Sequence, residues 1–176
     1  MEYPLHHHGG VTVTKMNKVW ISRSYLSAII SEIEDYAPLE TGGAFFGYIA
    51  ENKDIVITDL IHAGPKAKRS RYSFLPDQEF QINEMAHLFE QSHCKTTYLG
   101  DWHSHPTTSP ALSWKDERTL LKIALSDEAQ CKKPLMMVIG SLPEKWNINC
   151  VQFQSGKKKI WPFFSCEYRC LRIEVD

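Results

Sequence analysis

A chain of 176 residues with 43% hydrophobic and 23% charged residues has the size and composition of one ordinary globular domain, not of a disordered or fibrous protein. Its formal net charge of -1 gives no general attraction to nucleic acid or to an anionic membrane, so neither is expected as a partner. No apolar run approaches the ~20 residues of a membrane-spanning helix, and the N-terminus has no signal-peptide pattern, so we expect a cytoplasmic protein.

Hydrophobic periodicity divides the sequence into strands and helices. In chain order we expect a strand at 18–22, a helix at 22–37, a hairpin within 42–64, a basic loop at 65–73, a helix at 76–93, a strand at 96–105, a helix at 113–127, a strand buried on both faces at 133–141, a strand at 146–154, a turn at 155–159 and one or two strands within 160–175. Strands and helices alternate early and strands dominate late. The predicted fold is therefore α/β, with a mixed central sheet flanked by helices in a single domain.

We expect this domain to span residues 11–176, after a flexible N-terminal extension over residues 1–10. The three consecutive histidines of that extension have no structured partner ligand nearby, and they are left out of the argument about a metal site. The five cysteines are odd in number and include no C-x-x-C pair, so neither a disulfide framework nor a cysteine zinc module is expected.

The segment GDWHSHPTTSPALSWKD combines residue types that can bind a metal. His103 and His105 are two positions apart on a predicted strand, so both imidazoles project from the same face. Pro106 ends that strand, and a short loop returns the chain to a helix whose first turn carries Ser113 and Asp116. Two imidazole nitrogens and one carboxylate oxygen are a suitable ligand set for a hydrolytic zinc ion with a fourth position open to water.

A structural interpretation of the same helix start stays open. Ser113 before an apolar helix, with Asp116 three residues later, also matches a capping box, in which the two side chains satisfy backbone groups. The two interpretations do not exclude each other, although a carboxylate oxygen that binds a metal is less available to the backbone amide at the N-cap.

The pattern H-S-H-P, six further residues and S-x-x-D resembles the JAMM motif of the MPN+/JAB zinc metallopeptidases. That family also carries a glutamate after its first helix and before its first hairpin, where LETGG supplies Glu40. Taken alone, Glu40 would be a solvated acid at a helix end. The element order resembles the family's cytidine-deaminase-like α/β fold, and GDWHSHP, ETGG and RSRYSFLPD are most similar to bacterial Prok-JAB proteins, in particular the JAMM deconjugating peptidases of CBASS antiphage operons.

By matching position, the resemblance implies that His103, His105 and Asp116 bind Zn²⁺. It also implies that Glu40 acts as the general base and that Ser113 stabilises the tetrahedral oxyanion. The implied reaction is hydrolysis of the isopeptide or peptide bond after the C-terminal tail of a ubiquitin-like protein. The implied partner is a protein conjugated through such a tail, for example a nucleotidyltransferase joined by an E1/E2-like ligase.

Two alternatives to this function remain. One is a JAMM peptidase that processes a sulfur-carrier protein in cysteine or cofactor biosynthesis. The other belongs to a different class, the non-catalytic MPN scaffolds, which typically lack some of the ligands that are present here.

Further residues are candidates for supporting roles. Asp101 shares strand parity with both histidines and could orient one of them, with a purely structural role as the alternative, whereas Trp102 has the opposite parity and is expected in the core. Gly42 and Gly43 allow close backbone approach and are candidate substrate contacts. Four basic residues are candidate contacts for an acidic patch on the tail-bearing protein, unless they form only a solvated loop: Lys66, Lys68, Arg69 and Arg71.

Overall fold

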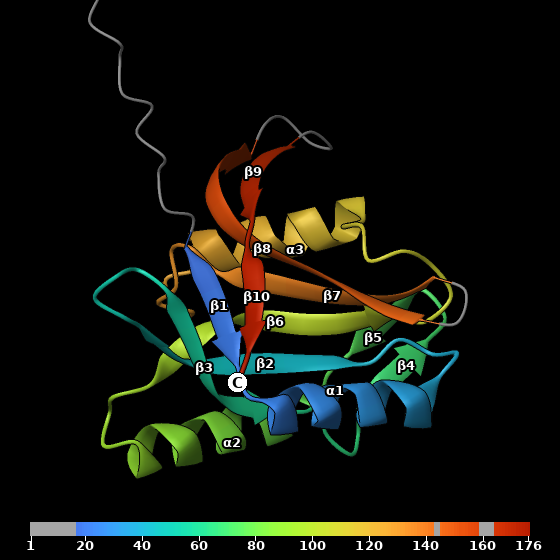
Figure 1. Cartoon of the computed structure of the whole chain (residues 1–176), viewed down its shortest axis with the longest axis horizontal. Coiled ribbons are helices and arrows are strands. Elements are labelled where there is room, and N and C mark those ends of the chain that lie inside the picture. The colour runs from blue at the N-terminus through green and yellow to red at the C-terminus, as the bar shows by residue number, and fades with distance from the viewer. Residues whose placement is uncertain (1–16, 143–144, 159–163) are drawn as a thin grey trace, which may run out of the picture.

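A computed structural model describes residues 17–142, 145–158 and 164–176 of the chain (Figure 1). Its elements are β1 Lys18–Ile21, α1 Arg23–Tyr36, β2 Gly42–Ile49, β3 Ile55–Ile61, β4 Lys68–Ser70, β5 Ser73–Leu75, α2 Gln78–Gln91, β6 Thr97–His105, α3 Trp114–Leu125, β7 Leu135–Leu142, β8 Lys145–Lys158, β9 Phe164–Cys170 and β10 Arg172–Val175. The predicted N-terminal extension with its histidines lies outside the described residues, as does the boundary predicted after residue 10.

The predicted α/β architecture is confirmed. Eight strands form one mixed sheet in the order β10-β1-β3-β2-β6-β7-β8-β9, and β4 and β5 form a separate two-stranded hairpin. All three predicted helices are present among the described residues. The strand β6, which carries the H-x-H pair, lies inside the sheet between an antiparallel neighbour, β2, and a parallel neighbour, β7.

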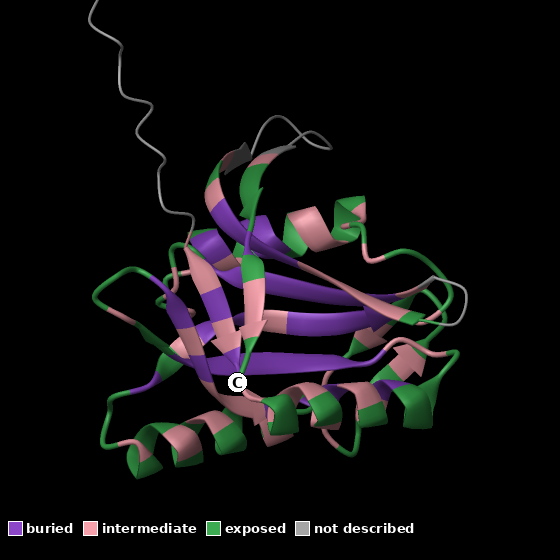
Figure 2. Ribbon diagram, in the orientation of Figure 1, coloured by how far each residue is buried: buried purple, intermediate pink, exposed green. Residues whose placement is uncertain are grey.

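The helices cover opposite faces of this sheet. Successive residues of β7 divide between two hydrophobic clusters, because Met137 packs with Ile33 of α1 whereas Met136 packs with Leu120 of α3. Met136 pairs with Asp101 of β6, and Asp101 pairs with Ala44 of β2, so the three side chains lie on the same face of the sheet. Ala44 belongs to the hydrophobic cluster that packs against α2. Helices α2 and α3 therefore share one face, and β7 is buried on both sides as its apolar run predicts. Figure 2 shows the central strands as the most buried part of the fold.

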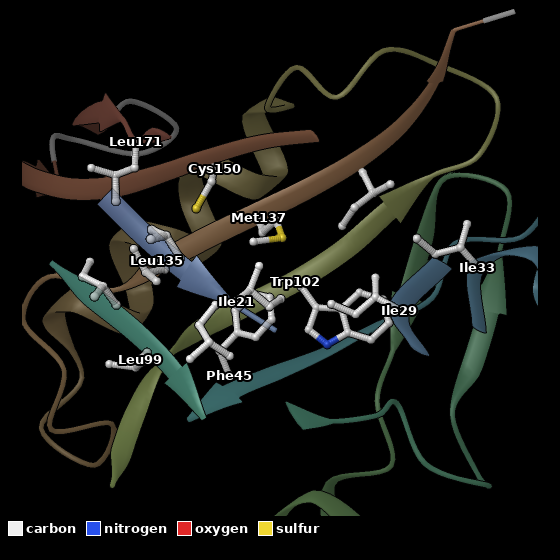
Figure 3. Close-up of a cluster of buried hydrophobic side chains, with 14 residues drawn as sticks. Ile21, Ile29, Ile33, Phe45, Leu99, Trp102, Leu135, Met137, Cys150 and Leu171 are labelled. Atoms are coloured by element: carbon white, nitrogen blue, oxygen red, sulfur yellow. The ribbon is translucent and has the colours of Figure 1, made fainter. Parts of the chain in front are cut away.

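The sheet curls around its main core until its two edges come together. Strands β9 and β10 lie at opposite ends of the strand order, yet only Leu171 separates them in sequence. The amide of Leu171 donates to the carbonyl of Cys150 at 2.8 Å, and its side chain enters the same cluster as Phe45 and Trp102 (Figure 3). One buried residue thus connects the two edges of the sheet and helps to enclose the core.

Two local predictions were wrong. Residues 155–158 of the predicted turn are strand, because β8 runs on to Lys158 and Gly156 pairs with Cys166 of β9, while residue 159 lies outside the described residues. A register shift between Phe153 and Ser155 precedes this part of β8, and such a bulge lets a strand bend without ending. The predicted basic loop at 65–73 also contains β4 and the start of the β4–β5 hairpin.

The helix boundaries follow local capping. The side chain of Ser22 accepts a hydrogen bond from the amide of Tyr25 at 3.2 Å and starts α1, and Asp77 accepts from the amide of Phe80 at 3.2 Å and starts α2. Within the described part of the chain, none of the helices has the length and hydropathy needed to cross a membrane.

The docking of α1 onto the main core can be tested by truncating one of its buried side chains. Ile33 is 0% exposed in that core, so Ile33→Ala should lower the free energy of unfolding by about 2–5 kcal/mol, through lost burial and the cavity left behind. The same change at Ile82, which is 61% exposed on α2, should cost less than about 0.5 kcal/mol. Urea denaturation followed by circular dichroism measures both, and equal costs would show that α1 is not packed as described.

Candidate metal centre

Strand β6 delivers both histidines to the face of the sheet that α3 covers. Because side chains alternate along a strand, His103 and His105 share this face, whereas Trp102 and Ser104 point to the opposite one. Both imidazoles are buried, and their Nε2 atoms lie 3.2 Å apart. The strand thus fixes two nitrogen donors side by side at its C-terminal end.

The start of α3 brings a carboxylate to these nitrogens. Asp116 Oδ1 lies 3.3 Å from His103 Nε2, and Asp116 Oδ2 lies 3.5 Å from His105 Nε2. Ser113 and Asp116 also form a full capping box: the Ser113 amide donates to Asp116 Oδ2 at 2.6 Å, and the Asp116 amide donates to Ser113 Oγ at 3.3 Å. The capping interpretation is therefore confirmed, and the bonds that cap the helix also aim the carboxylate at the histidines, as a metal site requires.

The spacing of the donor atoms suits a small tetrahedral cation. Among the described residues, one group of three or more His, Cys, Asp or Glu side chains has ligand atoms that all lie within 4.8 Å of one another. It consists of His103, His105 and Asp116. Two ligands of a tetrahedral zinc ion, each about 2.0–2.1 Å from the metal, are separated by roughly 3.3 Å. The 3.2 Å between the two Nε2 atoms matches this edge length, and the two Nε2 atoms lie 3.3 and 3.5 Å from different oxygens of Asp116. The donor set therefore fits Zn²⁺ in number and type, and its atoms lie close to the required spacing.

The protonation states of these groups also suit a metal. The backbone carbonyl of Ser109 accepts from His105 Nδ1 at 3.2 Å, so the proton of the neutral ring sits on Nδ1 and Nε2 presents its lone pair to the centre. Burial, together with the nearby His103, lowers the pKa of His105. Burial alone would raise the pKa of Asp116, but hydrogen bonds from His103 and Ser113 outweigh it and bring the pKa to about 2. A neutral imidazole and an ionised carboxylate are the forms that bind metal.

Glu40 lies in the same cleft. It lies in the irregular segment between α1 and β2, and its amide donates to the carbonyl of Ser70 in β4 at 2.7 Å. Burial raises the pKa of Glu40 to about 7, and the charge of Asp116 adds to this, while His103 and Lys115 oppose it. A carboxyl group with a pKa near neutrality can both accept and return a proton, which is the requirement for a general base.

These groups line a cleft of about 620 Å³. The β4–β5 hairpin supplies one wall with Tyr72, Phe74 and Leu75, and the first residues of α3 supply another with Ser113 and Trp114. Several of these apolar side chains are exposed: Tyr72, Leu75 and Trp114. The cleft therefore offers an open, partly apolar channel that leads to the three donor atoms.

Asp101 lines this cleft from beneath the histidines, but its hydrogen bond goes elsewhere. Its Oδ1 accepts from the hydroxyl of Tyr98 at 2.7 Å rather than from either imidazole. Burial raises the pKa of Asp101, and the Tyr98 hydrogen bond and the charge of His103 only partly offset this. The arrangement favours the structural alternative over a direct orienting contact with a histidine.

The two glycines contact their own sheet. Gly42 pairs with His103 and Gly43 with Trp102 across the β2–β6 ladder. A Cβ on Gly43 would lie 1.9 Å from the carbonyl oxygen of Ile61, so no other residue fits there. Gly43 also borders the cleft, but both glycines are buried. The close approach at Gly43 is between strands, whereas a Cβ on Gly42 would also lie 2.4 Å from the ring of Phe74 in β5.

The basic residues of the β4 region separate into two groups. Lys66, Lys68 and Arg71 are exposed outside the residues that line the cleft, and Lys66 pairs with the exposed Glu79. Arg69 differs from its predicted role, because its side chain is 9% exposed and turns inward to Glu32. A buried, paired guanidinium is not available to an acidic patch on another protein.

Two residues that connect Glu40 to the histidines, Thr41 and Ser104, were not predicted from the sequence. Ser104, between the two ligands, is fully buried and exchanges backbone and side-chain hydrogen bonds with Thr41, the residue after Glu40. The sequence does place Ser104 on the same face of the strand as Trp102, which is the face that packs in the core. A hydroxyl at a core-facing position needs a buried partner.

Comparison with known families gives one extensive match. The model of Prok-JAB, described as prokaryotic homologs of the JAB domain, matches residues 22–153. The solution structure of the protein DSY2949 from Desulfitobacterium hafniense has a TM-score of 0.61 and 17% sequence identity, and the match covers 90% of this chain and 92% of that one. At this identity the second match shows a shared fold only.

Three curated proteins are similar in sequence. The chain is 39% identical over 129 residues to "Probable metalloprotease y4qB" of Sinorhizobium fredii, a match that covers 73% of this chain and 79% of that protein. It is 28% identical over 123 residues to a "CD-NTase/cGAS isopeptidase" of Enterobacter hormaechei, covering 70% of this chain and 67% of that protein. A protein of the same name from Escherichia coli is 27% identical over 111 residues.

Metal binding by the three donor atoms can be measured directly. After equilibration with Zn²⁺ and exhaustive dialysis, His103→Ala and Asp116→Ala should each hold about one ion per chain less than the wild type, because three protein ligands are the usual minimum for a catalytic zinc site. His87→Ala is the control, since His87 is exposed on α2 and remote from the cluster. Metal content is read by inductively coupled plasma mass spectrometry. If both ligand variants kept the wild-type content, the three residues would not be the metal site.

Proposed function

The chain belongs to the Prok-JAB family, the prokaryotic homologs of the JAB domain, and on that premise we propose the reaction that its site performs. Members of this JAMM/MPN class are metallopeptidases, and this chain is one of them. The reaction is zinc-dependent hydrolysis of the peptide or isopeptide bond after the C-terminal tail of a ubiquitin-like protein. The observation that carries the proposal is the half-buried Glu40 carboxyl in the same cleft as three convergent ligand atoms.

In this reaction His103, His105 and Asp116 hold the ion. Bound Zn²⁺ would lower the pKa of a water molecule towards about 7 and polarise the scissile carbonyl. Glu40 takes the proton of the attacking water and later returns it to the leaving amine, a role that suits a carboxyl with a pKa of about 7. The complete ligand set argues against a non-catalytic scaffold.

Ser113 is placed to stabilise the negative charge that develops on the carbonyl oxygen. Its Oγ accepts a hydrogen bond from the amide of Asp116, and its hydroxyl also interacts with the Asp116 carboxylate. To donate to an oxyanion, the hydroxyl hydrogen turns from that carboxylate towards the cleft. Ser113 lines the cleft beside the ligand Asp116. A fixed donor aimed at the oxyanion lowers the barrier to its formation.

The shape of the cleft supports an extended peptide as substrate. Strand β5 pairs with β4 alone among the described residues, so its outer edge has backbone groups free for a further strand. A peptide tail can add to such an edge and place its terminal carbonyl near the metal ligands. The exposed side chains of Tyr72 and Trp114 on the two walls offer apolar contacts to the tail.

The similarity to proteins named CD-NTase/cGAS isopeptidase supports the cellular role. We assign to this chain the removal of a target protein from a bacterial ubiquitin-like conjugate, made by an E1/E2-like ligase in an antiphage system. A panel of substrates tests this assignment: the tail fused linearly to a reporter, joined to a reporter lysine, or carried by a sulfur-carrier protein with extra C-terminal residues. Cleavage of the carrier alone would move the function to sulfur-carrier processing.

The role of Glu40 predicts a separation of metal binding from catalysis. Glu40→Gln should keep the wild-type metal content and fold but lose about 10²–10⁴-fold in kcat, because the amide cannot accept the proton. Glu84→Gln, the same change at an exposed position of α2, should leave kcat unaltered. Both are measured by single-turnover cleavage of a tail–reporter fusion. Full activity in Glu40→Gln would remove this residue from the mechanism.

The roles of Ser113 in helix capping and in catalysis can be separated by comparison with Ser22, the N-cap of α1. Ser113→Ala and Ser22→Ala each remove an N-cap hydroxyl and should each cost about 1 kcal/mol in the free energy of unfolding. Only Ser113→Ala should also lower kcat, by about 10²–10³-fold, because only Ser113 faces the cleft. Thermal denaturation and cleavage assays measure the two effects. Equal kcat values in the two variants would restrict Ser113 to helix capping.

A further inference from the structure

Glu40 lies in a segment whose position no helix or regular strand fixes. The residues between the end of α1 and the start of β2 are irregular, and Glu40 and Thr41 are the last two of them. On one side, Glu40 donates its amide hydrogen to the Ser70 carbonyl at 2.7 Å. On the other, the Thr41 amide donates to Ser104 Oγ at 3.0 Å, and the Ser104 amide donates to the Thr41 carbonyl at 2.9 Å. Hydrogen bonds thus hold the segment between β4 and β6, the strand that carries His103 and His105.

A polar cluster that is buried except at His62, whose side chain is 46% exposed, holds the side chain of Thr41. We call it the Glu32 cluster: Glu32, Thr41, His62 and Arg69. Thr41 Oγ1 donates to Glu32 Oε1 at 2.7 Å and accepts from Arg69 Nε at 3.1 Å. A terminal nitrogen of Arg69 lies 3.5 Å from Glu32 Oε1, and His62 Nδ1 bonds to Glu32 Oε2. The side chains of Glu32 and Arg69 are only 10% and 9% exposed.

This cluster joins separate parts of the fold at one point. Glu32 comes from α1, His62 follows β3, Arg69 belongs to β4, and Thr41 belongs to the Glu40 segment. The Arg69 guanidinium also lies 3.6 Å above the ring of Tyr36 in the last turn of α1. Buried charges of this kind are costly unless every partner is satisfied, so the cluster holds its members in one arrangement.

We propose that Thr41, held by Arg69 and Glu32, is the positioning residue that sets the Glu40 carboxyl against the metal ligands. This inference rests on the proposed function, because it takes Glu40 as the base. Thr41 is the chain neighbour of Glu40, and its backbone is bonded to the residue between the two histidines. A shift of Thr41 therefore moves the base relative to the ligands, and misplacement of a catalytic group by about 1 Å can cost on the order of 10² in rate.

The test removes the Thr41 hydroxyl without changing the volume of the side chain. Thr41→Val should lower kcat by about 10- to 100-fold with KM within about twofold and metal content unaltered, because a misplaced base affects the chemical step rather than substrate binding. Thr41→Ser keeps the hydroxyl and should restore kcat to within about threefold of the wild type. Thr58→Val is the control: it removes a hydroxyl that bonds Asp59 on β3, outside the cleft, and should leave kcat unaltered.

A second measurement is independent of any substrate. Hydrogen exchange read by nuclear magnetic resonance should show faster exchange at the amides of Glu40 and Thr41 in Thr41→Val, with protection retained in β6 and β7 and recovered in Thr41→Ser. If Thr41→Val does not fold, Arg69→Lys replaces it, since lysine keeps the charge but cannot donate to Thr41 and Glu32 in the same fork. It should show the same two effects.

The outcomes separate the two proposals. If Glu40→Gln keeps full activity, the proposed mechanism fails. If Glu40→Gln is inactive while folded Thr41→Val has wild-type kcat and amide protection, or if Thr41→Ser is no better than Thr41→Val, the positioning role is overturned. For Arg69→Lys, wild-type kcat and protection overturn it likewise.

Discussion

The site depends on the reciprocal hydrogen bonds between Ser104 and Thr41. Ser104 lies between the two histidines on β6, and Thr41 follows the carboxyl that we assign as the base, so one buried contact connects residues that are 63 positions apart. Both residues are fully buried, so water cannot replace the hydrogen bonds between them. Because breaking it would leave several groups unpaired in the core, the relative position of ligand strand and base is set by the core itself.

Asp116, the third proposed ligand, is held by a different set of contacts. Asp116 is attached to α3 through the capping box with Ser113, and α3 is attached to the sheet through Leu120, Leu121 and Ala124. A helix start is a good support for a ligand, since its first turn presents amides that a carboxylate can accept from. One carboxylate can therefore serve the helix and face the histidines, so the same residues contribute to stability and to the chemistry of the site.

The sequence was sufficient for the helices, for most of the strands of the main sheet and for the residues that converge, but not for the β4–β5 hairpin or for the contacts that hold these residues. Periodicity predicts the helices and the buried strand β7, because burial on a given face requires apolar residues at a fixed period. The spacing of His103, His105 and Asp116 follows from strand and helix geometry alone. The extension of β8 through Gly156 and the inward turn of Arg69 depend on partners distant in sequence, β9 and Glu32, which no local pattern shows. Glu40 was found through the family motif rather than through its local sequence.

The single-residue connection at Leu171 has a consequence for how the chain reaches this state during synthesis. The parallel pair of β1 with β10 joins Lys18 to Arg172, so the first described strand gains that partner only after all the strands and helices between them have been synthesised. The strands β2, β3 and β6, which lie closer in sequence, can pair earlier. In a nascent chain, β6 would thus lie in a partly formed sheet in which the edge of β1 is still unpaired. Pairing of β10 with that edge would be a late event, because it closes a long loop.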